Sequence, residues 1–365
     1  MARKFGIAVV GCGRWGSHYV RILDQDPDVG VLTVYDERED RLQAIVRRSP
    51  NVRLARGLHE CLAADDVDAV VIATPATTHA AIGTTCLEAG KHVLMEKPIT
   101  TTAADAAAMM ELAESRGLTL MVGHTFLFNP AVLKVRELVM HPGLGKIHYL
   151  YARRTNLGPI RPDVNAVWDL AAHDISIFNF MLESVPLWAS AVGARVLGQR
   201  FEDVGFITLA YPHGIVGHIH VSWADPSKVR ELVVVAANER IVFNDMDPQE
   251  SVRVYQRGVS SNGTSPLGPA TFGEFKLTMR DGDIISPRIE PSEPLGNQIA
   301  HFLSCLRTGQ APATDAATGR DVVAVLEAID ESMSADGVPV RVGDTAARPR
   351  FGTRYRRARV ADPVP

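Results

Sequence analysis

Three ionisable side chains stand in segments where they could transfer protons. Lys97 comes directly after a buried apolar run, and Asp169 and His173 lie four residues apart in a segment with helical spacing. Histidine is the usual general acid or base near neutral pH, and a lysine can stabilise an alkoxide as it forms. Because positions i and i+4 share one face of a helix, we expect Asp169 and His173 to converge on one point or to pair. The alternatives are a surface lysine bound to Glu96 and a buried structural histidine.

A glycine motif near the N-terminus indicates a second kind of chemistry. Gly11, Gly13 and Gly16 follow the apolar run Phe5–Val10 and open a segment with helical spacing, and Asp36 comes 20 residues after the last glycine. In that context the glycines allow a tight turn and a close approach of backbone amides to a pyrophosphate, and the acidic residue binds ribose hydroxyls. The motif predicts a nicotinamide or flavin dinucleotide site; a purely structural turn is the alternative.

The residues around Asp36 predict which dinucleotide is bound. A carboxylate at this position would accept hydrogen bonds from the adenine ribose and repel a 2′-phosphate, which favours NAD over NADP. Arg38, two residues further on, could soften that preference, so NADP stays open as a second cofactor. A solvated acidic residue after a strand is the alternative interpretation of Asp36.

Strands and helices are predicted to alternate over the first 123 residues. Short apolar runs rich in Val, Ile and Ala are typical of strands buried on both faces of a parallel sheet, and the segments between them have helical spacing. The predicted strands are 5–10, 31–35, 67–73, 91–95 and 118–122, and the predicted helices are 17–23, 38–48, 79–88 and 102–116. This alternation predicts a doubly wound Rossmann sheet, which binds ligands at the carboxyl ends of its strands.

After residue 123, period-two alternation predicts a mostly antiparallel sheet with helices on one face. Asn129 and Pro130 are predicted to begin a helix that ends near Val139. The predicted strands are 147–154, 189–197, 206–210, 216–223, 231–236 and 252–256, and two further helices are expected over 295–307 and 316–333. The fold class is therefore α/β: an N-terminal Rossmann domain (1–123), a C-terminal α+β domain for substrate binding and oligomerisation (124–345), and a basic tail (346–365).

Composition and charge limit the classes of protein to which the chain can belong. Its 365 residues exceed one ordinary hydrophobic core, and 46% hydrophobic with 22% charged residues is typical of globular proteins. A net charge of −4 offers no positive field for nucleic acid, and the four cysteines show no CxxC pair, zinc spacing or disulfide pattern. We expect no metal, no nucleic acid partner and no membrane segment. A cytoplasmic location is expected because no spanning or signal segment precedes the first strand.

Together these motifs resemble a known family, the glucose-fructose oxidoreductase, inositol dehydrogenase and MocA-type (GFO/IDH/MocA) oxidoreductases. The resemblance covers nearly the whole chain. It rests on the glycine motif and on Thr74-Pro75 with His79, Glu96-Lys97-Pro98 and Asp169-x-x-x-His173. It implies a Rossmann domain joined to an antiparallel α/β domain, with NAD(P) as cofactor and sugars or cyclitols as substrates.

The resemblance also implies which residues act. The catalytic roles would fall on Lys97, Asp169 and His173. Family members often carry an acid three positions after the histidine, but Ser176 stands there and Asp174 is adjacent to the histidine, so its orienting partner is open. The cofactor-binding residues would be Gly11, Gly13, Arg14, Trp15, Gly16, Asp36, Arg38, Thr74, Pro75, His79, Glu96 and Lys97.

The segment before Asp169 is predicted to bind the substrate. Its arginines and asparagines could contact sugar hydroxyls or a diphosphate, although a solvated loop is an equally good interpretation. The stretch from Gly123 to Pro130 also resembles family members that act on nucleotide-linked sugars, among them the UDP-N-acetylglucosaminuronate 3-dehydrogenases. The predicted substrate-binding residues are His124, Tyr151, Arg153, Asn156, Arg161, Asn165, Trp168, Asp169 and His173.

The predicted reaction is hydride transfer between nicotinamide and a ring carbinol or ketone carbon of a sugar or nucleotide-linked sugar. His173, alone or with Lys97, would take the hydroxyl proton during oxidation and return it during reduction. The alternatives are a non-catalytic NAD(H) sensor, a free sugar or inositol dehydrogenase, an unsaturated-bond reductase and a glycosidase with transient oxidation. If the outer face of the second sheet is apolar, a homodimer or homotetramer formed sheet to sheet would bury it.

Overall fold

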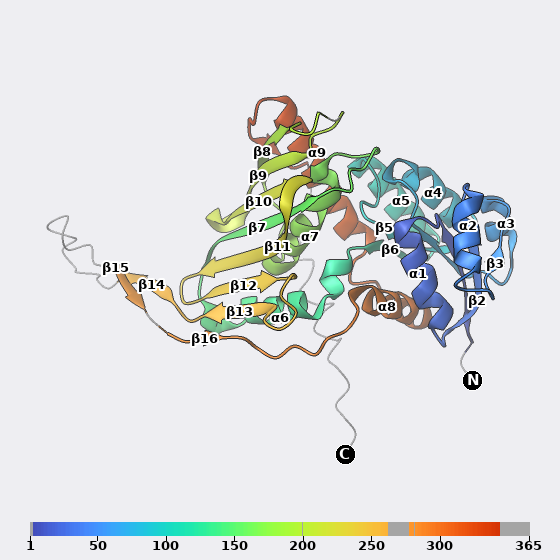
Figure 1. The fold of residues 1–365 in the computed structure, drawn as a ribbon, viewed down its shortest axis with the longest axis horizontal. Helices are drawn as coiled ribbons and strands as arrows, with labels where there is room; N and C mark the ends of the chain where they lie inside the picture. Colours follow the sequence, from blue (N-terminus) through green and yellow to red (C-terminus); the bar gives the residue numbers. More distant parts are fainter. Residues whose placement is uncertain (1–2, 199, 262–276, 281, 344–365) are drawn as a thin grey trace, which may run out of the picture.

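The computed structural model describes residues 3–198, 200–261, 277–280 and 282–343, which form two units, each built around one large sheet (Figure 1). The N-terminal unit contains the first sheet, with α1 and α2 on one side and α4 and α5 on the other. The predicted basic tail lies outside the described residues. No described helix is long and apolar enough to cross a membrane.

The first sheet has six parallel strands in the order β3-β2-β1-β4-β5-β6. The order reverses between β1 and β4, the position at which such sheets bind dinucleotides, so the predicted Rossmann domain is confirmed. The strands are β1 (Phe5–Val10), β2 (Val29–Tyr35), β3 (Arg53–Leu54), β4 (Ala69–Ile72), β5 (His92–Glu96) and β6 (Leu120–Gly123). The helices are α1 (Arg14–Gln25), α2 (Glu39–Val46), α3 (Leu58–Ala63), the 3₁₀ turn η1 (Ala76–Thr78), α4 (His79–Glu88) and α5 (Ala103–Ser115).

The second sheet has nine strands in the order β16-β13-β12-β11-β7-β10-β9-β8-β17. All neighbours are antiparallel except β7 and β10, which confirms the predicted mostly antiparallel sheet. The strands are β7 (Ile147–Leu157), β8 (Trp188–Ala194), β9 (Val204–Ala210), β10 (Val216–Ser222), β11 (Ala224–Ala236), β12 (Arg240–Asn244), β13 (Val252–Tyr255), β16 (Ile284–Ile285) and β17 (Val340–Arg341). A separate ribbon pairs β14 (Gly258–Ser261) with β15 (Leu277–Arg280).

Helices cover one face of the second sheet. Along β7, Leu150 and Ala152 are buried in the core that the sheet shares with these helices, whereas Tyr149 and Tyr151 alternate with them and lie on the other face. The helices are α6 (Pro130–Val139), α7 (Ala172–Leu182) and α9 (Ala316–Ser334), with short turns at η2 (Thr125–Phe128), η3 (Pro142–Leu144) and η5 (Pro212–Gly214). As predicted, Asn129 caps α6, since its side chain accepts a hydrogen bond from the backbone amide of Ala131.

Helix α8 (Pro294–Thr308) follows the second sheet in the chain but packs on the first unit, where it lies beneath α1 in Figure 1. Its buried residues Leu295, Ile299 and Phe302 belong to one hydrophobic cluster with Ile7 and Val9 of β1. The division at residue 123 stays our proposal for the domain boundary, with α8 as a later segment that stabilises the first unit. This packing brings residues from distant parts of the chain close to the site described below.

Candidate active site

The glycine motif lies at the carboxyl end of β1, where α1 begins. Gly11 has a φ of +90°, and a Cβ on Gly16 would lie 1.8 Å from the carbonyl oxygen of Gly11, so both positions require glycine. A Cβ on Gly13 would meet no atom closer than 3.7 Å. The space in front of the α1 N-terminus is therefore open, and no side chain caps that terminus, which fits a pyrophosphate on its free amides. Arg14 and Trp15, in the first turn, are exposed there.

Asp36 lies beside this turn at the end of β2. Its carboxylate accepts hydrogen bonds from the backbone amides of Cys12 (2.7 Å) and Arg38 (2.8 Å) and from Nη1 of Arg41 (3.2 Å). The guanidinium of Arg38 instead pairs with Asp40. Arg41, which the sequence analysis did not single out, is therefore the guanidinium that the fold brings to the Asp36 carboxylate.

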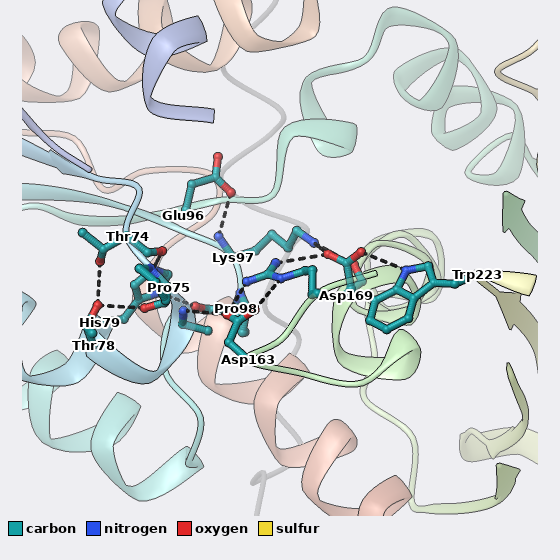
Figure 2. A network of polar contacts seen from close by, with 12 residues as sticks. Thr74, Pro75, Thr78, His79, Glu96, Lys97, Pro98, Asp163, Asp169 and Trp223 are labelled. Atoms are coloured by element: carbon teal, nitrogen blue, oxygen red, sulfur yellow. Dashed lines mark hydrogen bonds and ion pairs between the residues drawn. The ribbon is translucent and has the colours of Figure 1, made fainter. Parts of the chain in front are cut away.

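His79 connects the loops that follow β4 and β5 (Figure 2). Its ring nitrogens lie 2.8 Å from the carbonyl oxygen of Pro98 and 2.9 Å from that of Thr74. Burial lowers the pKa of His79, although the two carbonyls oppose that effect. The side chain is 1% exposed. His79 therefore braces the strand-end loops that hold Thr74, Pro75 and Lys97.

Glu96 does not pair with the side chain of Lys97. Its carboxylate accepts hydrogen bonds from the hydroxyl of Tyr19 (2.8 Å) and from the backbone amide of Lys97 (3.0 Å). Tyr19 in turn accepts from Gln298 of α8. Burial raises the pKa of Glu96, and the tyrosine hydroxyl opposes that shift. The Glu96 side chain therefore joins α1, β5 and α8, and the alternative of a surface lysine bound to Glu96 is wrong.

The side chain of Lys97 reaches across to the second unit (Figure 2). It is 4% exposed, and its Nζ lies 2.7 Å from the backbone oxygen and 3.3 Å from Oδ1 of Asp169. The Asp169 carboxylate also accepts from Nη1 of Arg161 (3.1 Å) and Nε1 of Trp223 (3.3 Å). Arg161 is itself held by Asp163. Two motifs far apart in the sequence thus meet in one buried ion-pair network.

Burial and neighbouring charges act in opposite directions on the pKa values in this network. Although burial alone would raise it, the ammonium of Lys97 and the guanidinium of Arg161 hold the pKa of Asp169 below its ordinary value. Burial lowers the pKa of Lys97, and the nearby Asp169 carboxylate limits that decrease. An ammonium at this position has restricted access to water, and such a group stabilises a developing alkoxide.

Two imidazoles near Lys97 have no hydrogen-bond partner among the described residues. Both ring nitrogens of His124 are enclosed and unpaired, and so is Nδ1 of His173. Nε2 of His173 is not enclosed, and its ring packs edge-on against Phe126. Burial lowers the pKa of His124 to about 3; burial, with Lys97 and Arg154 nearby, lowers that of His173 well below its ordinary value. Both are therefore neutral at neutral pH, and unpaired buried nitrogens are costly without a ligand.

Asp169 and His173 do not pair, which is a correction to one expected arrangement. Residues 167–171 form a π-helical turn (η4), and α7 begins only at Ala172. The Asp169 carboxylate is instead bound by Lys97, Arg161 and Trp223, and among the described residues no hydrogen bond joins it to His173. Both still lie near Lys97, which fits the other expectation, convergence on one point.

Neither Asp174 nor Ser176 orients the histidine ring. Asp174 accepts two hydrogen bonds from Arg154, at 2.9 and 2.8 Å, in a pair that is almost fully buried. The hydroxyl of Ser176 donates to the backbone oxygen of His173. The guanidinium of Arg154 also lies 4.3 Å from the centre of the Phe126 ring. The Arg154–Asp174 pair therefore attaches α7 to β7 and positions His173 through the backbone.

Several predicted substrate residues lie elsewhere. Trp168 and Asn165 donate hydrogen bonds to Asp330 of α9, and Asn156 donates to the backbone oxygen of Gly158. Tyr151 accepts from Arg240, and Arg153 shares the face of β7 on which Tyr151 lies, away from the helices. Of the predicted set, the structure brings Arg161, Asp169, His173 and His124 together with Lys97. Sequence reasoning missed Trp223, Phe126 and Arg154, which carry no local motif. It also missed Arg230, whose guanidinium lies 5.9 Å from the centre of the Phe126 ring.

Comparisons with known proteins identify relatives of the chain. The chain is 28% identical over 295 residues to the UDP-N-acetylglucosamine 3-dehydrogenase of Acidithiobacillus ferrooxidans, covering 80% of this chain and 86% of that protein. It is 25% identical to the D-apiose dehydrogenase of Paraburkholderia graminis, covering 89% and 87%. The crystal structure of GenD2 from gentamicin A biosynthesis, in complex with NAD, has the same fold, with a TM-score of 0.77, 24% identity and coverage of 93% of this chain and 97% of that one.

Two family models match successive parts of the chain. Residues 5–124 match a model described as an oxidoreductase family with an NAD-binding Rossmann fold, and residues 132–242 match the GFO/IDH/MocA C-terminal domain. The matches cover the Rossmann sheet and about half of the second unit, and they include Lys97, Asp169 and His173. The chain therefore belongs to the GFO/IDH/MocA family, and it is an NAD-binding oxidoreductase.

Proposed function

We propose that this protein transfers a hydride between NAD and a ring carbinol or ketone carbon of a sugar, with Lys97 and His173 as the groups that handle the oxygen and its proton. The observation that supports this most strongly is the buried ammonium of Lys97, which Asp169 holds beside His124 and His173. The relatives include proteins named as dehydrogenases of a nucleotide sugar, of apiose and of inositol. Because these relatives are named for sugar or cyclitol substrates, we propose that a hydroxyl of such a compound is the group that this protein oxidises.

In the proposed oxidation, Nε2 of His173 accepts the hydroxyl proton, because this nitrogen is unpaired and the ring is neutral. The Lys97 ammonium stabilises the negative charge that develops on the substrate oxygen. When bound, NAD would be held at the uncapped N-terminus of α1 and would supply the hydride acceptor for this oxidation. In the reverse direction His173 returns the proton to the carbonyl oxygen. Asp169, Arg161 and Trp223 hold the lysine in place.

The alternative of a non-catalytic NAD(H) sensor explains less of the structure. A sensor needs the glycine turn and Asp36, but it has no use for a buried ammonium and two unpaired imidazoles, which are costly to maintain. The test follows absorbance of reduced nicotinamide with NAD(H) and NADP(H) against UDP- and dTDP-sugars, free sugars and inositols. Turnover of any carbinol supports the enzyme; saturable NAD binding with no turnover across the panel would favour the sensor.

The outer face of the second sheet supports a homodimer or homotetramer as part of this proposal. Tyr149, Val192, Phe206 and Val216 are 42–59% exposed on that face, and an apolar surface of this kind is usually covered in solution. Light scattering at micromolar concentration tests the assembly, and a clean monomer would contradict it. We also propose the cytoplasm as the compartment, supported by four buried, unpaired cysteines.

A further inference from the structure

A cavity of about 370 Å³ lies directly beside the Lys97–Asp169 pair. Two of the residues that line it, Arg161 and Trp223, are the same residues that hydrogen-bond the Asp169 carboxylate. The rest of the wall is formed by Ile160 and Pro162, on the connection between β7 and α7, and by Arg200 and Phe201, on the connection between β8 and β9. The cavity is therefore adjacent to the groups proposed to handle the substrate oxygen.

The two arginines that line this cavity differ in their partners. Arg161 is bound to both Asp163 and Asp169, and Asp169 also binds Lys97. Arg200 is exposed and has no carboxylate partner within the described part of the chain; its guanidinium lies 5.1 Å from the centre of the Phe201 ring. The guanidinium of Arg200 is therefore available to pair with an anionic group of a ligand.

The size and the walls of the cavity indicate which kind of ligand fits it. A volume of about 370 Å³ lies within the range of small-molecule sites, so the cavity has room for a sugar ring with a short substituent. Phe201 and Trp223 supply flat aromatic surfaces, which suit the C–H faces of a sugar. The guanidinium of Arg200 offers a planar set of donors to phosphate or carboxylate oxygens.

We propose that this cavity binds an anionic substituent of the sugar substrate, with Arg200 as the residue that pairs with it. The inference rests on the proposed function, because it extends the same active site. A phosphate or diphosphate on the anomeric carbon and a carboxylate on the ring share the chemistry that Arg200 recognises.

The test compares the wild-type protein with Arg200→Ala and Arg200→Lys. The control is Arg288→Ala, which removes an exposed arginine paired with Glu290 and absent from the cavity wall. The substrates are UDP-N-acetylglucosamine, N-acetylglucosamine 1-phosphate, glucuronate and uncharged N-acetylglucosamine. Loss of one charge-assisted contact should raise KM for the anionic substrates about 10- to 100-fold in Arg200→Ala, with partial rescue in Arg200→Lys. The kcat values, KM for the uncharged sugar and the Kd of NAD should stay unchanged.

The outcomes separate the two proposals. If the wild type shows no preference for anionic over uncharged sugars, or if Arg200→Ala raises both KM values equally, the cavity assignment is wrong even though turnover supports the enzyme. If no substrate turns over, the proposed reaction fails, and calorimetric titration of the NAD-bound protein with N-acetylglucosamine 1-phosphate still tests the cavity. The cavity assignment would then be supported if Arg200→Ala weakens this binding and Arg288→Ala does not. Comparing glucuronate with the phosphate shows which anion is preferred.

Discussion

The two ends of the candidate active site differ in how their polar atoms are satisfied. Around Asp169, the ammonium of Lys97, the guanidinium of Arg161 and the indole of Trp223 all have partners. Around His173 and His124, three ring nitrogens are enclosed without a partner among the described residues. Paired charges fix a geometry, whereas unpaired buried groups are costly and are retained where a ligand completes them. This difference fits the proposal that Asp169 and its partners position the reacting groups and that the two histidines receive the substrate.

The largest expected effect comes from Lys97→Met. Without the ammonium, the developing alkoxide is unsupported, and kcat should fall about 10³-fold. Asp169 also loses a charged donor, so the free energy of unfolding should fall by about 1–3 kcal/mol. Steady-state kinetics and denaturant unfolding measure the two effects. The matched control is Lys91→Met, because the hydrogen bonds of Lys91 within the described residues go to the backbone oxygens of Ala64 and Val67. A wild-type kcat in Lys97→Met would show that the lysine takes no part in the reaction.

His173→Phe tests the difference between the two ends of the site, because it should lower activity without lowering stability. Losing the proton acceptor should lower kcat about 10²-fold. Stability should stay level or rise, since the substitution removes an enclosed nitrogen that has no partner. Thermal unfolding and NADH absorbance provide the measurements. A large loss of stability would mean that His173 is a structural residue, the alternative considered from sequence.

A smaller effect is expected for His124→Phe. If a ligand group satisfies one of its enclosed nitrogens, the Kd of NAD or the KM of the sugar should rise about 2- to 10-fold, the contribution of one neutral hydrogen bond. The protein should be no less stable than the wild type. His124→Gln, which keeps a donor and an acceptor, should recover part of the affinity. Unchanged constants for both ligands would show that His124 contacts neither.

The smallest effect is a shift in the basic limb of the pH profile. The folded state lowers the pKa of Lys97 from its ordinary 10.5, so the ammonium is lost as pH rises through a value below that of a free lysine. In that range kcat/KM for oxidation should decline. Lys97→Arg should lose this limb, because a guanidinium stays charged. An identical limb in wild type and Lys97→Arg would assign the titration to another group.

Much of the fold could be predicted because its patterns are local. The strand Phe5–Val10 and the helix His79–Glu88 have the bounds that apolar spacing predicts. Short elements were missed: β3 is two exposed residues, and α3 has six. Strand β12 was also missed, although it pairs with β11 in the middle of the second sheet. Strand propensity depends on packing against neighbouring strands, so short elements of this kind are hard to predict from the local sequence.

The sequence by itself determined the Rossmann motif and the family, and it selected Lys97, Asp169 and His173 as candidate active-site residues. Each of these conclusions depends on residue types at short, fixed spacings. Only the tertiary structure decided which side chains meet. The Asp169 carboxylate pairs with Lys97 and Arg161 rather than with His173, and Trp168 donates a hydrogen bond to Asp330. Arg200 reaches the cavity from another connection. Local spacing fixes which face of an element a residue occupies, whereas its partners are set by how the two sheets and their helices pack.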